Sequence, residues 1–146
     1  MGILNQELKT STAKVDGRII SIWPGDINKI KIVTPDFKHS LIRAEASQSA
    51  LIVDDFSKIN FTFWPIDQTS FSTYPIKTTA QALEDLKKGS GIVILEPKGV
   101  QVSITSVSLA YFESENYNPY LLPILVFEGP NFVAYVPAIV EQYIAH

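Results

Sequence analysis

The chain has 146 residues and no cysteine, and its 12 Lys and Arg and 15 Asp and Glu are dispersed without a basic stripe. This composition excludes thiolate chemistry, cysteine-based zinc sites and disulfides, and it argues against nucleic acid as the main partner. A chain of this length fits one domain and buries enough apolar surface to fold without a metal.

The first residues of the chain are polar and aperiodic, so we expect residues 1–15 to form a flexible arm. They lack the apolar stretch that a signal peptide requires. The remaining residues, 16–146, are expected to form a single domain.

Apolar and β-branched runs in the N-terminal half predict strands at 19–23, 27–33 and 58–67. In the second run, Ile30 and Ile32 alternate with lysines, which is typical of a half-buried strand. Residues 42–46 also alternate, with Arg43 and Glu45 on the polar side, and a short helix is the alternative there.

A short motif recurs after two of these runs. Trp23-Pro24-Gly25-Asp26 is echoed by Trp64-Pro65-Ile66-Asp67. The repeat is compatible with a two-part sheet that arose by duplication.

The segment after Tyr74 predicts a short helix. Thr78 is a good N-cap and Gln81 follows three residues later, as in a capping box. Leu83 and Leu86 belong to an apolar stripe, and Gly89 ends the helix. Although Gly89-Ser90-Gly91 resembles a phosphate-binding loop, it follows a helix instead of preceding one, so we interpret it as a helix end.

The C-terminal half predicts four strands, at 92–96, 102–112, 120–128 and 131–138. The apolar phase changes inside the second of them, which indicates a bulge or a bend near Thr105-Ser106. The last two form a hairpin that is apolar on both faces, so the helix is expected to cover one face and the N-terminal half or a second subunit the other. Pro123 and Pro137 should lie at a bulge, a strand end or an edge.

No catalytic motif is present, and we expect neither a metal nor a cofactor. The two histidines, His39 and His146, are far apart in the sequence, and a lone loop histidine is typically solvated. Asp54-Asp55 is the one adjacent carboxylate pair, and we interpret it as a polar turn.

Aromatic residues gather on and beside the predicted hairpin. Tyr111, Phe112, Tyr117 and Tyr120 are the candidate partner-binding residues, because tyrosine is enriched at protein interfaces. The alternative is that they are core and strand-edge residues, since aromatic side chains favour strands in general.

Residues 74–139 resemble the PepSY and YycI-like domains of exported bacterial proteins. The matching positions are Ala82, Leu83, Leu86 and Gly89 in the helix, Leu109, Ala110 and Tyr111 in the next strand, Leu122, Pro123, Val126 and Phe127 in the hairpin, and residues 131–139 at its end. Phe112 and Leu125 depart from the pattern.

The resemblance implies a helix laid across an antiparallel sheet, located outside the cytoplasmic membrane behind an upstream anchor. Such domains act as binding, inhibitory or sensing modules, and the resemblance assigns no catalytic residue to this chain. The resemblance does not cover the first 73 residues.

We therefore expect an α+β fold, an antiparallel sheet with a short helix packed across it. The favoured function is a non-enzymatic, extracytoplasmic binding or regulatory domain of the bacterial envelope, monomeric and with a protein or peptide partner. Two alternatives stay open. One is a hydrolase or ligand-binding enzyme that uses Asp26, Asp54, Asp55 or Asp67, and the other is a structural domain that dimerises through the hairpin.

Overall fold

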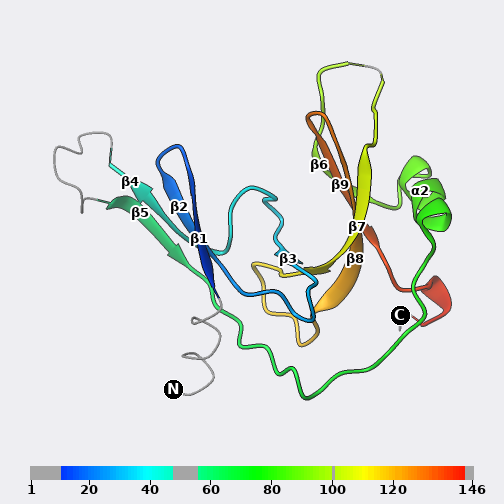
Figure 1. The fold of residues 1–146 in the computed structure, drawn as a ribbon, viewed down its shortest axis with the longest axis horizontal. Helices are drawn as coiled ribbons and strands as arrows, with labels where there is room; N and C mark the ends of the chain where they lie inside the picture. Colours follow the sequence, from blue (N-terminus) through cyan, green and yellow to red (C-terminus); the bar gives the residue numbers. More distant parts are fainter. Residues whose placement is uncertain (1–10, 48–55, 100, 144–146) are drawn as a thin grey trace. The chain divides into compact units, whose positions relative to one another are not determined.

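The computed structural model describes residues 11–47, 56–99 and 101–143, and Figure 1 shows the ribbon. The chain divides into two compact units. The first unit comprises Met1–Asp67 and Glu113–Pro119, and the second comprises Gln68–Phe112 and Tyr120–His146. The α+β fold is confirmed, because each unit contains an antiparallel sheet and a short helix packs on the second of these sheets. That residues 16–146 behave as a single domain stays a prediction.

The first unit is built on a four-stranded antiparallel sheet with the order β1-β2-β4-β5. Its strands are β1 (Thr12–Asp16), β2 (Ile19–Trp23), β4 (Ile42–Ala46) and β5 (Phe56–Phe61). The strand at 42–46 is therefore confirmed over the helical alternative. The flexible arm is wrong for residues 12–15, which belong to β1, and residues 1–10 lie outside the described ranges.

The strand predicted at 27–33 is wrong over most of its length, because only β3 (Ile32–Val33) is extended. Asn28 and Lys29 have φ angles of 51° and 67°. Ile27 and Ile30 exchange two backbone hydrogen bonds of 2.9 Å across them. Positive φ at both central residues is the signature of a type I′ turn, in which asparagine is favoured. Ile27 and Ile30 therefore flank a tight turn, and of the two alternating isoleucines, Ile30 and Ile32, only Ile32 belongs to a strand.

The second unit contains a sheet in which β7, β8, β9 and β6 are neighbours in that order, each pair antiparallel. The strands are β6 (Ile92–Leu95), β7 (Ser106–Phe112), β8 (Leu122–Gly129) and β9 (Phe132–Pro137), followed by the 3₁₀ helix η1 (Glu141–Tyr143). Pro137 ends β9 and Pro123 is the second residue of β8, so both prolines lie at strand ends as expected. β7 begins only at Ser106 and pairs with β8 in continuous register, so the strand predicted at 102–112 is shorter than expected and contains no bulge, which leaves the bend as the compatible alternative.

The helix α2 (Thr79–Lys87) forms where the sequence predicts it. The Thr78 side chain accepts from the backbone N–H of Gln81, and the Gln81 side chain accepts from the backbone N–H of Thr78, which completes the capping box. Gly89 has a φ angle of 82°, the left-handed conformation that ends a helix. Within the described ranges, no helix is long and apolar enough to cross a membrane.

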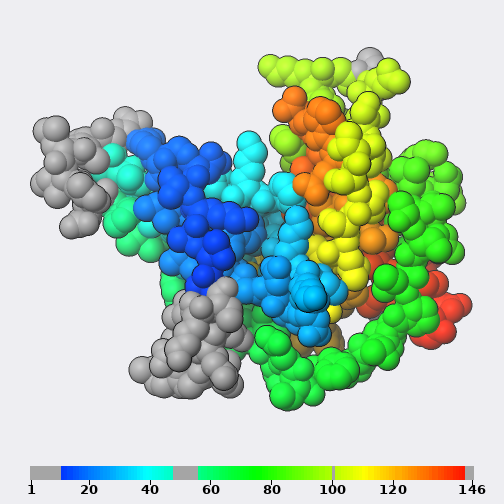
Figure 2. Space-filling view, in the orientation of Figure 1, coloured from blue at the N-terminus to red at the C-terminus, as the bar shows by residue number. Residues whose placement is uncertain are grey.

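The core of the second unit lies between α2 and one face of its sheet, and Figure 2 shows the helix in green against the yellow and orange strands. Its buried members are Ala82, Leu125, Phe127, Phe132, Ala134, Val136 and Ala138, with Leu83, Leu86, Val107 and Leu109 packed against them. On the opposite face, Ile124, Val126, Val133 and Tyr135 are also buried. Burial of the hairpin on both faces agrees with its two-face apolar pattern.

Candidate functional site

One face of the first unit's sheet is apolar and open to solvent. The register places Val15, Ile20, Ala44 and Ile59 in one row across the four strands and Ala13, Ile22, Ile42 and Phe61 in the next. Val15, Ile59 and Phe61 are 71%, 69% and 66% exposed, although a strand face of this kind is normally covered. All five residues of β1 are exposed, and Figure 2 shows this strand in dark blue at the surface.

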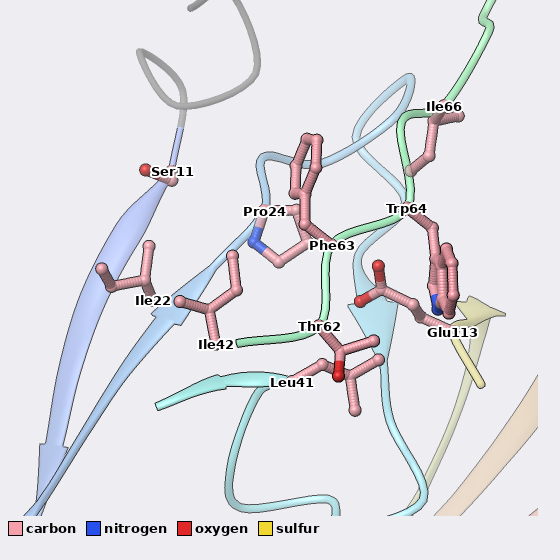
Figure 3. A pocket seen from close by; sticks show the side chains of 10 residues that line it. All are labelled: Ser11, Ile22, Pro24, Leu41, Ile42, Thr62, Phe63, Trp64, Ile66 and Glu113. Atoms are coloured by element: carbon pink, nitrogen blue, oxygen red, sulfur yellow. The ribbon is translucent and has the colours of Figure 1, made fainter. Parts of the chain in front are cut away.

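The recurring Trp-Pro motif forms the end of this face. Strands β2 and β5 both pair antiparallel with β4, so they run in the same direction and their C-terminal ends meet at one end of the sheet. Pro24 leaves β2 there, and Phe63 and Trp64 follow β5 there. Figure 3 shows Pro24 and Phe63 beside Ile22 and Ile42, with Trp64 further along. Both copies of the motif therefore contribute residues to one recess at the end of a single sheet, and their origin by duplication stays a prediction.

The wall that Trp64 forms is fixed by contacts within the first unit. Its indole Nε1–H donates to the carbonyl of Ser114 at 2.9 Å, and its ring meets Tyr117 edge-on at 5.4 Å between centroids. The backbone N–H of Glu113 donates to the carbonyl of Val33 at 2.8 Å. These bonds hold the segment 113–119 against the recess, so the wall does not depend on a ligand for its position.

The recess itself is almost filled by its own side chains. Its free volume is about 20 Å³, room for little more than one water molecule. The carboxylate-bearing residue Glu113 contributes to its lining and is 8% exposed. The recess is therefore a nearly filled end to the apolar face and not a deep small-molecule pocket.

The opposite face of the same sheet is polar and carries a larger cavity. Alternation along the strands puts Asp16, Arg43, Glu45, Lys58 and Asn60 on this side. A cavity of about 210 Å³ is lined by Ile19, Asp36, His39, Arg43, Glu45, Lys58 and Asn60. The two faces of the sheet thus offer different chemistry.

His39 is not the solvated loop residue that its isolation in the sequence predicts, since its side chain is only 14% exposed. Its Nδ1 lies 2.8 Å from Asp36 Oδ2, and its Nε2 lies 3.2 Å from Asp16 Oδ2. The second contact lacks the alignment of a hydrogen bond. Asp36 and His39 belong to one turn, so the first contact is local in the sequence. Asp16 comes from a distant strand, so the second contact cannot be predicted from the residues around His39.

Asp36 is the central carboxylate of this network. Burial alone would raise its pKa, but the hydrogen bond with His39, the backbone N–H of Lys38 and the charges of His39 and Arg43 together lower the pKa below its ordinary value. The charged form of Asp36 is therefore favoured in the folded protein.

The structure places the four predicted binding residues in different surroundings. Tyr111 and Phe112 are neighbours on β7 and point to opposite faces, and Phe112 meets Tyr135 edge-on at 6.0 Å. Tyr117 belongs to the first unit and Tyr120 to the second. These two are 70% and 72% exposed. A shared role for the four residues stays a prediction.

The carboxylates of the enzymatic alternative do not gather at a described cavity. Asp26 and Asp67 are exposed and line neither the recess nor the polar cavity. Asp54, Asp55 and His146 lie outside the described residues. Among the residues that the structure describes, no group of three or more His, Asp and Glu side chains could hold a metal ion.

Comparison with family models, curated proteins and solved structures finds no match to this chain. The resemblance of residues 74–139 to PepSY and YycI-like domains therefore stays a prediction.

Proposed function

We propose that the protein is a non-enzymatic binding module that docks an extended, apolar segment of a protein partner on the first unit's sheet. The docking surface is the apolar face defined by Val15, Ile59 and Phe61, with the Trp64 recess at its end. The exposure of these three side chains on one face carries the proposal. Open apolar patches of this kind mark interaction sites on soluble proteins.

The size of the face favours a short segment as the occupant. Four strands about 4.8 Å apart and five residues with a rise of about 3.3 Å cover roughly 300 Å². A stable complex of two folded proteins buries about 800 Å² on each partner. A second copy of the chain would therefore need further contacts, whereas a peptide-like segment could be held by this face alone.

The proposal extends to an extracytoplasmic, regulatory role in the bacterial envelope. The support for this part is the resemblance of residues 74–139 to PepSY and YycI-like domains. Fractionation of cells that express the chain from its own gene is the direct measurement, and recovery from the cytoplasm would contradict this part alone.

The docking surface can be tested by selecting peptides from a random displayed library on the purified full-length protein. We expect the selected peptides to be rich in bulky apolar residues and to bind the Phe61→Lys variant at least about tenfold more weakly, because a lysine there leaves its charge against an apolar ligand. Phe61 is 66% exposed, so the variant should fold.

Ile92→Lys is the matched control, since Ile92 is 62% exposed on a strand of the second unit. It should bind the same peptides as the wild type. Equal affinity of the wild-type and Phe61→Lys proteins for every selected peptide would contradict the proposal.

A further inference from the structure

The polar cavity of the first unit is lined by acidic and basic side chains. The acidic ones already have hydrogen-bond or ion-pair partners. Asp36 Oδ1 accepts from the backbone N–H of Lys38 at 3.1 Å, and Asp36 Oδ2 lies 2.8 Å from His39. Glu45 Oε1 lies 3.4 Å from the Arg18 guanidinium. Both carboxylates in the lining are therefore satisfied by neighbours in the protein.

The donors of the cavity are largely uncommitted. The Arg43 guanidinium makes one long ion pair, 3.9 Å to Asp36, which leaves most of its five N–H donors without a close acceptor among the described residues. The side chains of Lys58 and Asn60 make no ion pair or hydrogen bond with any residue that the structure describes. The cavity thus has N–H donors and positive charge available for a negatively charged hydrogen-bond acceptor.

The sheet register brings these donors together. Arg43 on β4 is directly opposite Asn60 on β5, and Lys58 is opposite Glu45, one step along the same face. Neighbouring side chains in such a pair lie about 5 Å apart, and diagonal ones about 7–8 Å apart. An oxyanion between Arg43 and Lys58 can therefore reach Asn60 as well, and a bidentate contact with Arg43 suits its planar geometry.

From this arrangement we infer that the polar cavity binds a small oxyanion, a carboxylate or a phosphate group, held by Arg43, Lys58 and Asn60. The cavity of about 210 Å³ limits the ligand to a small molecule or to one side chain of a larger one. Because it lies on the face of the sheet opposite the apolar docking surface, this inference is independent of the proposed function.

The test is a nuclear magnetic resonance titration of the full-length protein with succinate and, separately, with inorganic phosphate. Sodium chloride at equal ionic strength is the reference. We expect saturable shifts of the Asn60 side-chain amide and the Arg43 Nε–H with at least one oxyanion, and an affinity about fivefold or more weaker in Lys58→Gln, which loses one charge-assisted contact. The stronger of the two oxyanions identifies the group that the cavity prefers.

Lys98→Gln is the matched control, because Lys98 is exposed and belongs to the second unit. It should bind the probes as the wild type does. Shifts that chloride reproduces, or an equal loss of affinity in Lys58→Gln and Lys98→Gln, would overturn the inference. So would titrations in which neither oxyanion moves the Asn60 and Arg43 signals.

Discussion

Gly129 shows how a single residue fixes the second unit. A Cβ atom built on it would lie 1.8 Å from the carbonyl oxygen of Ser103, far closer than any tolerated contact. The backbone of Ser103 can approach β8 only because position 129 has no side chain. We expect Gly129→Ala to lower the free energy of unfolding by roughly 3 kcal/mol or more, since the strand or the segment around Ser103 must move.

Gly89→Ala provides the comparison for this prediction. Gly89 has positive φ, but no atom lies within 4 Å of its built Cβ. Alanine there should cost only roughly 1–2 kcal/mol of backbone strain. Urea unfolding of both variants measures the difference, and equal losses of stability would show that Ser103 does not pack on Gly129 in solution.

Asp36 should make the stability of the protein depend on pH. Its pKa is lowered in the folded state, so the ionised carboxylate stabilises the fold at pH values above its ordinary pKa. This contribution is lost as the pH falls through the lowered folded value. We expect Asp36→Asn to have a lower Tm at neutral pH and a shallower decline of Tm in acid than the wild type.

Thermal melts across the acidic range measure this effect. Asp26→Asn serves as the control, because Asp26 is exposed and makes no ion pair among the described residues. Its curve should run parallel to that of the wild type. A parallel curve for Asp36→Asn as well would contradict the role of the His39 contact.

At the scale of elements, α2 depends on packing more than on its own propensity, because nine residues form a marginal helix in isolation. Leu86 packs against the core beneath the helix. We expect Leu86→Asp to unfold the second unit or to reduce its stability by several kcal/mol, since a carboxylate would be placed against apolar side chains.

Ala80→Asp is a matched substitution on the exposed side of the same helix. An acidic residue in the first turn interacts favourably with the helix dipole, so its effect should be neutral or slightly stabilising. Circular dichroism melts distinguish the two variants. A Tm of Leu86→Asp within a few degrees of the wild type would show that the helix does not pack as described.

The sequence predicts those elements that depend on interactions between residues close together in the chain. The capping box of Thr78 and Gln81 and the turn at Gly89 depend on residues within one helix, and both are confirmed. β1 was missed although Ala13 and Val15 alternate with charged residues, because so short a pattern has little weight beside a polar arm. The turn at Asn28-Lys29 was missed because lysine rarely adopts positive φ.

The candidate sites could not be predicted from the sequence, because they depend on which residues of different strands lie opposite one another. Arg43 and Lys58 belong to different strands, and only the pairing of β4 with β5 puts them on the same side of a cavity. The crowding around Gly91 has the same origin, since a Cβ there would meet the Tyr135 carbonyl oxygen at 3.0 Å. The sequence alone predicts only that Gly91 lies near the end of a helix.

At the scale of the whole molecule, the two units have different exposed chemistry. The first presents an open apolar sheet face and a polar cavity behind it. In the second, one sheet face is covered by α2 and the residues Ile124, Val126, Val133 and Tyr135 of the other face are buried. Ile92 on the edge strand β6 is exposed in the second unit, whereas Val15, Ile59 and Phe61 of the first unit share one open face, so we expect an apolar segment to dock on the first unit.

The most direct test of this claim is a map of backbone amide shifts in the full-length protein as a selected peptide is added. We expect the perturbed amides to cluster in β1, β2, β4 and β5 and in the residues around Trp64. Perturbations confined to β6 to β9, or centred on Tyr111, Phe112 and Tyr120, would contradict it and would place the binding surface on the second unit.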